Sequence, residues 1–307
     1  EKFSWWGSTK QKNEKFSWRG ISAFMVIYYH FSNRVPYTAL NAAHAPTIEF
    51  YSGSLGVMIF FAISGYLITQ SLAGSKDLAS FLAKRVSRIW PLFILAAITI
   101  FVAMQFLEPP VVTGAEQPLK GGSTRFLDLI GNLFFLQDLG FQWIDGVFWS
   151  VLVELKFYLW VAVLACLVPR HFVVIFAVGA AVLASCELFI RIYDVALLAP
   201  VAKALNGVFI AQHAPFFAIG ALLASGKSRT LLTLNLLVAA CTIAWKIGEN
   251  PHLNALGTTE FIFALAAIFA LDSVLLKSRL FLTIGDYSYS WYLFHQLIGL
   301  SLIRIWA

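Results

Sequence analysis

The feature that most constrains this chain is a succession of apolar runs, each about 18 or more residues long, separated by short polar segments. A helix of that length crosses the ~30 Å hydrocarbon core of a bilayer. Of the 307 residues, 59% are hydrophobic and only 12% are charged, which leaves too few charged groups to solvate a soluble domain. We therefore predict an all-α polytopic membrane protein, a bundle of about nine to ten transmembrane helices.

Nine crossings are predicted, at residues 16–32, 54–73, 91–107, 147–168, 172–192, 207–225, 231–248, 258–276 and 280–306. A tenth apolar segment, Phe126 to Gly140, is short for the hydrocarbon core and carries several polar residues (Asp128, Asn132, Gln137 and Asp138). Such a segment is typical of a partial, re-entrant insertion. We expect residues 1–307 to form a single transmembrane domain with no appended soluble domain.

The positive charges indicate topology rather than nucleic-acid binding. The net charge is +6, but the basic residues lie in short groups between apolar runs and not along one polar face. With a cytoplasmic N-terminus and nine crossings, 14 of the 22 Lys and Arg residues fall in cytoplasmic groups. A tenth crossing at Phe126 to Gly140 would move the last three of these groups outside (Arg170; Lys227 and Arg229; Lys277 and Arg279). Because short cytoplasmic loops carry the Lys/Arg excess, nine crossings are favoured over ten.

Arg19 and His30 are the first pair of candidate functional residues, because ionisable side chains inside apolar spans are costly and tend to serve a function. They are eleven residues apart, which puts them within roughly 20° of the same helix face and about 16 Å apart. The alternative for His30 is a structural histidine bonded to a neighbouring helix.

Lys84, Arg85 and Arg88 form a second candidate group, just before the Trp90-Pro91 pair at which the next span is expected to begin. Arg85 and Arg88 are three residues apart and so share a helix face. They are either an ordinary positive-inside anchor or a phosphate clamp for a nucleotide-like donor, since arginine presents a planar fork to phosphate oxygens.

Two further groups place polar side chains on one face of a helix. Ser150 and Glu154 are four residues apart, and a buried carboxylate with a partner or a raised pKa suits acid/base catalysis or the orientation of a histidine. Ser288, Tyr292 and His295 are stacked four and then three residues apart, which fits the wall of a cavity better than contact with lipid. The three cysteines (Cys166, Cys186 and Cys241) show no metal-ligand spacing, and we expect them to be core side chains.

Taken together, these groups resemble the membrane acyltransferase-3 family of integral membrane glycan O-acyltransferases, and the resemblance runs almost the full length of the chain. The matching residues, in chain order, are Arg19 and His30; Gly56 to Ile68; Arg85, Arg88 and Pro91; Trp149, Ser150, Glu154, Phe157 and Tyr158; and Ser288, Tyr289, Tyr292 and His295. The chain departs from the family pattern at Val151, where leucine is commoner, and after His295, where a proline is often found.

The resemblance implies transfer of an acyl group, expected to be acetyl, from cytoplasmic acetyl-CoA to a hydroxyl of a cell-surface or exported glycan, in the bacterial inner membrane and without a metal. The implied roles are catalysis for His30 and Glu154; donor binding for Arg19, Arg85, Arg88, Ser288 and Tyr292; and acceptor binding for Trp149, Ser150, Tyr158, Tyr289 and His295. His30 would take the proton of the acceptor hydroxyl while Glu154 orients it, or would itself form an acyl-histidine; both routes need the same residues.

A secondary transporter or a flippase for glycan-linked substrates is the alternative, because such proteins also carry buried polar groups near the middle of the membrane. The sequence has no pair of interrupted helices in matching halves, and transport does not require two cytoplasmic arginines on one helix face. Uptake of labelled glycan without acetyl-CoA would indicate transport, whereas labelling of the glycan that depends on acetyl-CoA would indicate an enzyme.

Overall fold

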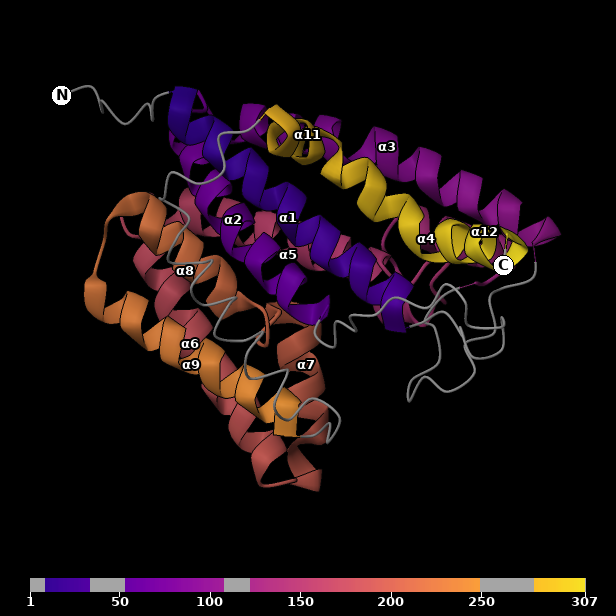
Figure 1. Ribbon diagram of the computed structural model, residues 1–307. Coiled ribbons are helices and arrows are strands. Elements are labelled where there is room, and N and C mark those ends of the chain that lie inside the picture. The colour runs from indigo at the N-terminus through magenta and orange to yellow at the C-terminus, as the bar shows by residue number, and fades with distance from the viewer. Residues whose placement is uncertain (1–8, 34–52, 108–121, 249–278, 307) are drawn as a thin grey trace.

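A computed structural model describes residues 9–33, 53–107, 122–248 and 279–306, and within these ranges the chain forms helices and no β-strand (Figure 1). The longer helices are α1 (Thr9–Asn33), α2 (Gly53–Ala73), α3 (Leu78–Phe106), α5 (Phe148–Leu167), α6 (Phe172–Ile192), α9 (Arg229–Gly248) and α11 (Arg279–Phe294). The shorter ones are α4 (Phe126–Leu133), α7 (Ala199–Phe209), α8 (Ala214–Ser225) and α12 (Leu300–Trp306). The predicted all-α class is confirmed.

Five segments of the described chain are long and apolar enough to cross a membrane: Leu55–Ala73, Leu78–Phe106, Phe148–Leu167, Phe172–Ile192 and Ala196–Ser225. Each coincides with, or includes most of, a crossing predicted from sequence. The predicted crossing at 258–276 lies outside the described residues. On α3 the large apolar side chains that remain exposed follow one another along one face, as expected of a surface that contacts lipid (Leu95, Ile98, Val102 and Phe106).

The segment Phe126 to Gly140 is too short to cross. Helix α4 has eight residues, about 12 Å of helix, and a three-residue 3-10 turn, Gln137–Leu139, follows it. Two of its buried polar residues hold the following loop: Asp128 accepts hydrogen bonds from the Ser123 hydroxyl (2.6 Å) and the Gln142 N–H (3.0 Å), and the Asn132 amide donates to the Gln142 carbonyl (2.8 Å). These buried polar groups are therefore satisfied within the protein.

Helix α3 begins at Leu78, thirteen residues before Pro91, so the predicted crossing at 91–107 is the second part of a longer helix. Asp77 caps the helix, because its side chain accepts a hydrogen bond from the Ser80 N–H at 2.6 Å, and this bond lowers the pKa of the Asp77 carboxyl. Pro91 lies inside the helix, where the rest of the hydrogen-bond ladder and the packing tolerate it. Arg85 and Arg88 therefore belong to α3 itself.

Two of the predicted continuous spans are interrupted. The last one, predicted as 280–306, contains a π turn at His295–Gly299 between α11 and α12. The crossing predicted at 207–225 is broken near its start, between α7 and α8, at Ile210, whose φ of 50° lies in the left-handed region. The prediction that the three cysteines are core residues is also wrong, since Cys166, Cys186 and Cys241 are all exposed at the surface of the helices.

The centre of the bundle is formed by α1, which lies between α2 and α11, with α5 and α8 packed against α2 (Figure 1). Helices α2 and α8 approach so closely that a Cβ atom at Gly220 would lie 1.8 Å from the carbonyl oxygen of Ala62. Small residues at such crossings are the usual device of membrane helices. Three buried rings stack on one another beside this contact, with Phe217 of α8 4.6 Å from Phe61 of α2 and 4.1 Å from Phe157 of α5 between ring centroids.

Candidate functional site

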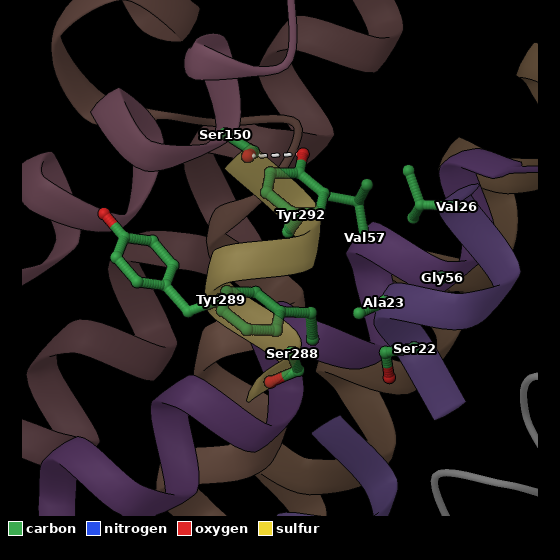
Figure 2. A pocket seen from close by; sticks show the side chains of 10 residues that line it. Ser22, Ala23, Val26, Gly56, Val57, Ser150, Ser288, Tyr289 and Tyr292 are labelled. Carbon is green, nitrogen blue, oxygen red and sulfur yellow. Dashed lines mark hydrogen bonds between the residues drawn. The ribbon is translucent and has the colours of Figure 1, made fainter. Parts of the chain in front are cut away.

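A narrow cavity lies between four of the central helices, and Figure 2 shows the side chains around it. Its lining comes from α1 (Ser22, Ala23, Val26), α2 (Gly56, Val57, Phe60), α5 (Ser150) and α11 (Ser288, Tyr289, Tyr292). The stacked polar residues of the last long helix were predicted to form a cavity wall, and the structure confirms this for Ser288 and Tyr292.

The polar groups of the cavity wall tie α11 to its neighbours. The Tyr292 hydroxyl and the Ser150 hydroxyl share a hydrogen bond of 2.7 Å, drawn in Figure 2. The Tyr289 hydroxyl donates to the carbonyl oxygen of Ile89 on α3 at 3.2 Å, and the Ser288 hydroxyl donates to the carbonyl of Gly285 in its own helix at 2.7 Å. The wall is thus fixed in place by bonds to α3 and α5.

A buried ion pair, whose residues do not line the cavity themselves, lies about one helical turn from Ser22 on α1 and from Ser150 on α5, toward the start of α1; this is called the arginine end. The Arg19 Nη2 atom is 3.9 Å from the Glu154 Oε1 atom, and only 9% and 5% of these two side chains are exposed. The same carboxylate oxygen accepts hydrogen bonds from the Ser64 hydroxyl (2.8 Å) and the Tyr158 hydroxyl (2.5 Å). The Arg19 guanidinium also stacks over the Phe60 ring, 5.0 Å from its centroid.

The arginine end carries an excess of positive charge. The charges of Arg85, Arg88 and Glu154 all act on the Arg19 guanidinium, so three cations and one carboxylate belong to the same part of the protein. Arg85 donates to the Ser71 hydroxyl at 2.8 Å, and Arg88 is exposed. Two buried nitrogens of Arg19, Nε and Nη1, have no hydrogen-bond partner among the described residues. Unpaired buried donors of this kind favour an anionic ligand.

Two histidines meet on the opposite side, about one helical turn beyond the lining residues Val26 on α1 and Tyr292 on α11; this is called the histidine end. The rings of His30 on α1 and His295 in the π turn lie edge to face, with 5.0 Å between their centroids. His295 Nδ1 is 2.7 Å from the carbonyl oxygen of Tyr292, whereas its buried Nε2 atom has no hydrogen-bond partner among the described residues. This end is about 16 Å along α1 from Arg19.

The sequence predicted that Glu154 would orient His30. The structure instead places Glu154 beside Arg19. The reason is the direction of α5. Ser150 contacts Tyr292, close to the histidines, and Glu154 lies one helical turn further along α5, which brings it to Arg19. Helix α5 therefore runs from the histidine end to the arginine end, antiparallel to α1, and the ring beside His30 is that of His295.

The remaining predicted site residues lie around the cavity rather than in its lining. Tyr158 binds Glu154, and Trp149 packs against the rings of Phe61 (6.2 Å) and His213 (5.2 Å). His213 was not singled out from sequence, and no motif marks it. Ser64, which bonds to Glu154, was part of the Gly56 to Ile68 motif but was not assigned a role.

Asp145 is a third residue that the sequence motifs do not mark, although it lies just before Trp149-Ser150. It is fully buried, and its two carboxylate oxygens accept hydrogen bonds from the N–H groups of Val147 (3.1 Å) and Leu297 (3.3 Å). Burial raises the pKa of this carboxyl to about 7 against the weaker opposing effect of the two N–H bonds. Within the described ranges, no three His, Cys, Asp or Glu residues are grouped so that they could hold a metal ion.

The chain is similar in sequence to parts of several known proteins. A protein of Acidianus two-tailed virus is 28% identical over 143 residues, which are 47% of this chain and 38% of that protein. Nodulation protein 10 of Rhizobium leguminosarum bv. viciae is 34% identical over 113 residues (34% of this chain, 31% of the relative), and the O-acetyl transferase of Shigella phage Sf6 is 37% identical over 75 residues (24% and 21%).

These alignments span well under half of each relative, and no solved structure matches the chain. The sequence does match the family described as acyltransferase domain over residues 17–306, which is nearly its whole length and includes both ends of the cavity. The chain therefore belongs to the acyltransferase 3 family.

Proposed function

We propose that this protein is a membrane O-acetyltransferase that moves an acetyl group from acetyl-CoA, bound at the arginine end, to a glycan hydroxyl at the histidine end. The observation that carries the proposal is the cavity, which lies between a surplus of positive charge and a pair of buried histidines. The names of its relatives support the reaction class, since one of them is an O-acetyl transferase.

The donor is proposed to bind through its phosphates to Arg19, Arg85 and Arg88. Arginine is suited to this because its fork of N–H groups binds phosphate oxygens in pairs, and two buried nitrogens of Arg19 still lack a partner in the described structure. The thioester arm would then extend along the cavity wall past Ser288 and Tyr292. Glu154 would hold Arg19 in place, a role that its contacts favour over the orientation of His30.

His30 is proposed to be the base that removes the proton of the acceptor hydroxyl. The acceptor oxygen forms a bond with the acetyl carbon, the carbon–sulfur bond of the thioester breaks, and the proton passes through His30 to the CoA sulfur. His295 would face the acceptor through its Nε2 atom, with Ser150, Tyr289, Trp149 and Tyr158 supporting the site. A route through an acetyl-histidine uses the same residues.

Replacement of His30 by alanine tests the proposal most directly. In protein reconstituted with labelled acetyl-CoA and glycan extracted from the producing cells, His30→Ala should lower kcat by at least ~100-fold, the size of a general-base contribution. Binding of acetyl-CoA should not change, because the arginines lie at the other end of the cavity. His171→Ala, which alters an exposed loop histidine, is the matched control. Near wild-type transfer by His30→Ala would refute the proposal, and uptake of glycan without acetyl-CoA would favour transport.

The arginine end is proposed to face the cytoplasm, in the inner membrane of a bacterium. Two of the basic groups expected there do lie together, since the Lys227 ammonium donates to the Arg170 carbonyl at 2.8 Å. In a variant without the native cysteines, an impermeant thiol reagent applied to intact cells should label a cysteine at Asp194, at the far end of α6, and not one at Ser228. The reverse pattern would overturn this orientation.

A further inference from the structure

The π turn that carries His295 is held by a carboxylate from a distant part of the chain. Asp145 lies in the loop before α5, about 150 residues earlier in the sequence, and none of its surface is exposed. One of its oxygens accepts the Val147 N–H at the start of α5, and the other accepts the Leu297 N–H within the π turn. Asp145 thus joins the beginning of α5 to the turn through two backbone hydrogen bonds.

The π turn sets the position of His295. A π turn winds more residues per turn than an α-helix and is rare outside functional sites, so it needs support from its surroundings. On one side the turn packs directly on α1, because a Cβ atom at Gly299 would lie 2.8 Å from the Phe31 ring. On another side Asp145 holds Leu297, two residues after His295. In this arrangement the centroid of the His295 ring lies 5.0 Å from that of the His30 ring.

We propose that Asp145 is a positioning residue that acts through His295: its carboxylate keeps the π turn in the register that sets the two histidine rings against each other. Each backbone bond to a buried carboxylate is charge-assisted when the group is ionised, and loss of such a bond leaves a buried N–H without its partner. The effect on transfer rests on the proposed function, whereas the effect on His295 itself does not.

Chemical modification of His295 tests the inference without any assay of activity. In wild-type protein His295 is 5% exposed, so diethyl pyrocarbonate should modify it slowly, as read by mass spectrometry of peptides. Asp145→Asn removes one of the two acceptor oxygens, and Asp145→Ala removes both; the rate at His295 should rise several-fold in alanine and less in asparagine. The rate at His171, which is exposed, serves as an internal reference.

Asp128→Asn is the matched control. Asp128 is also a buried carboxylate beside the same loop, 2% exposed, and accepts the Gln142 N–H, but it does not contact the π turn. It should leave the rate at His295 unchanged. Equal rates of His295 modification in wild type and Asp145→Ala would overturn the inference. An increase in Asp128→Asn as large as that in Asp145→Ala would also overturn it, because it would indicate only a loosened loop.

A double-mutant cycle separates positioning from a general loss of stability. Asp145→Asn should lower kcat for acetyl transfer and leave the KM for acetyl-CoA unchanged, since Arg19 in the proposed donor site lies about 16 Å along α1 from His30, which faces His295. In a His295→Gln background the same substitution should have no further effect on kcat; independent, multiplicative losses would contradict the proposal. A wild-type protein without transfer activity would refute the proposed function instead, and the modification rates would still decide the role of Asp145.

Discussion

Replacing Glu154 by glutamine should destabilise the protein strongly, because it removes the carboxylate that faces the buried Arg19. The two charged atoms are 3.9 Å apart, and with an effective dielectric constant of about 20 their attraction is about 4 kcal/mol. Loss of one partner of a buried ion pair costs about 3–5 kcal/mol in other proteins, since the remaining charge has no compensation. The two figures agree, so we expect a loss of about 4 kcal/mol.

Glutamine isolates the charge from the shape. Its amide oxygen can still accept hydrogen bonds from Ser64 and Tyr158, so the packing around position 154 is kept. The assay is denaturant or thermal unfolding of the purified protein in detergent. Glu187→Gln is the control, because Glu187 is also buried and paired with an arginine, but 41% of the Arg191 side chain is exposed and can be solvated after the substitution. That control should lose much less stability.

The double variant Arg19→Met with Glu154→Gln completes the test. Removal of both charges should recover most of the stability that Glu154→Gln loses, because a buried pair can be replaced by apolar groups at little cost. Acetyl-CoA binding should not recover, since Arg19 is proposed to bind the donor. A Glu154→Gln protein as stable as wild type, or a double variant no more stable than the single one, would refute the reasoning about this pair.

Three further predictions follow from the fold and the site. Replacing both Arg85 and Arg88 by lysine should weaken acetyl-CoA binding while it preserves the positive charge, because lysine lacks the bidentate fork; unchanged affinity in equilibrium binding would leave them as topology anchors. Gly220→Ala should lower the free energy of unfolding by about 1–3 kcal/mol through overpacking. Gly179→Ala, with no atom within 4 Å of the new Cβ, should raise it by about 0.5–1 kcal/mol. Equal effects of the two substitutions on unfolding in detergent would contradict the close helix contact. Burial raises the pKa of Asp145 from 3.8 to about 7, so its carboxyl contributes stability at low pH that is lost as the pH rises through about 7. Asp145→Asn should lack this part of the pH dependence of the melting temperature.

The sequence alone was enough to predict features that belong to a single helix, namely its span and the residues that share one of its faces. The length of each apolar run showed that the chain lies in a membrane and located most of its spans. This was possible because each segment must by itself meet the free-energy cost of placing backbone polar groups and charges in hydrocarbon. Residues on the same face of one helix were also predictable: Arg85 with Arg88, and Ser288 with Tyr292 on the cavity wall. These pairs follow from the helical repeat alone.

The tertiary structure was needed to show which helices meet and at which residues along each helix they do so. Ser150 and Glu154 share a face of α5, but the antiparallel direction of α5 places Ser150 against Tyr292 in the cavity wall and Glu154 beside Arg19. The π turn at His295–Gly299 and its bond to Asp145 were equally invisible in sequence, since a helix departs from its regular geometry where a contact from elsewhere stabilises the departure. The helical repeat gives the direction in which a side chain points, and the packing of the other helices decides what it meets there.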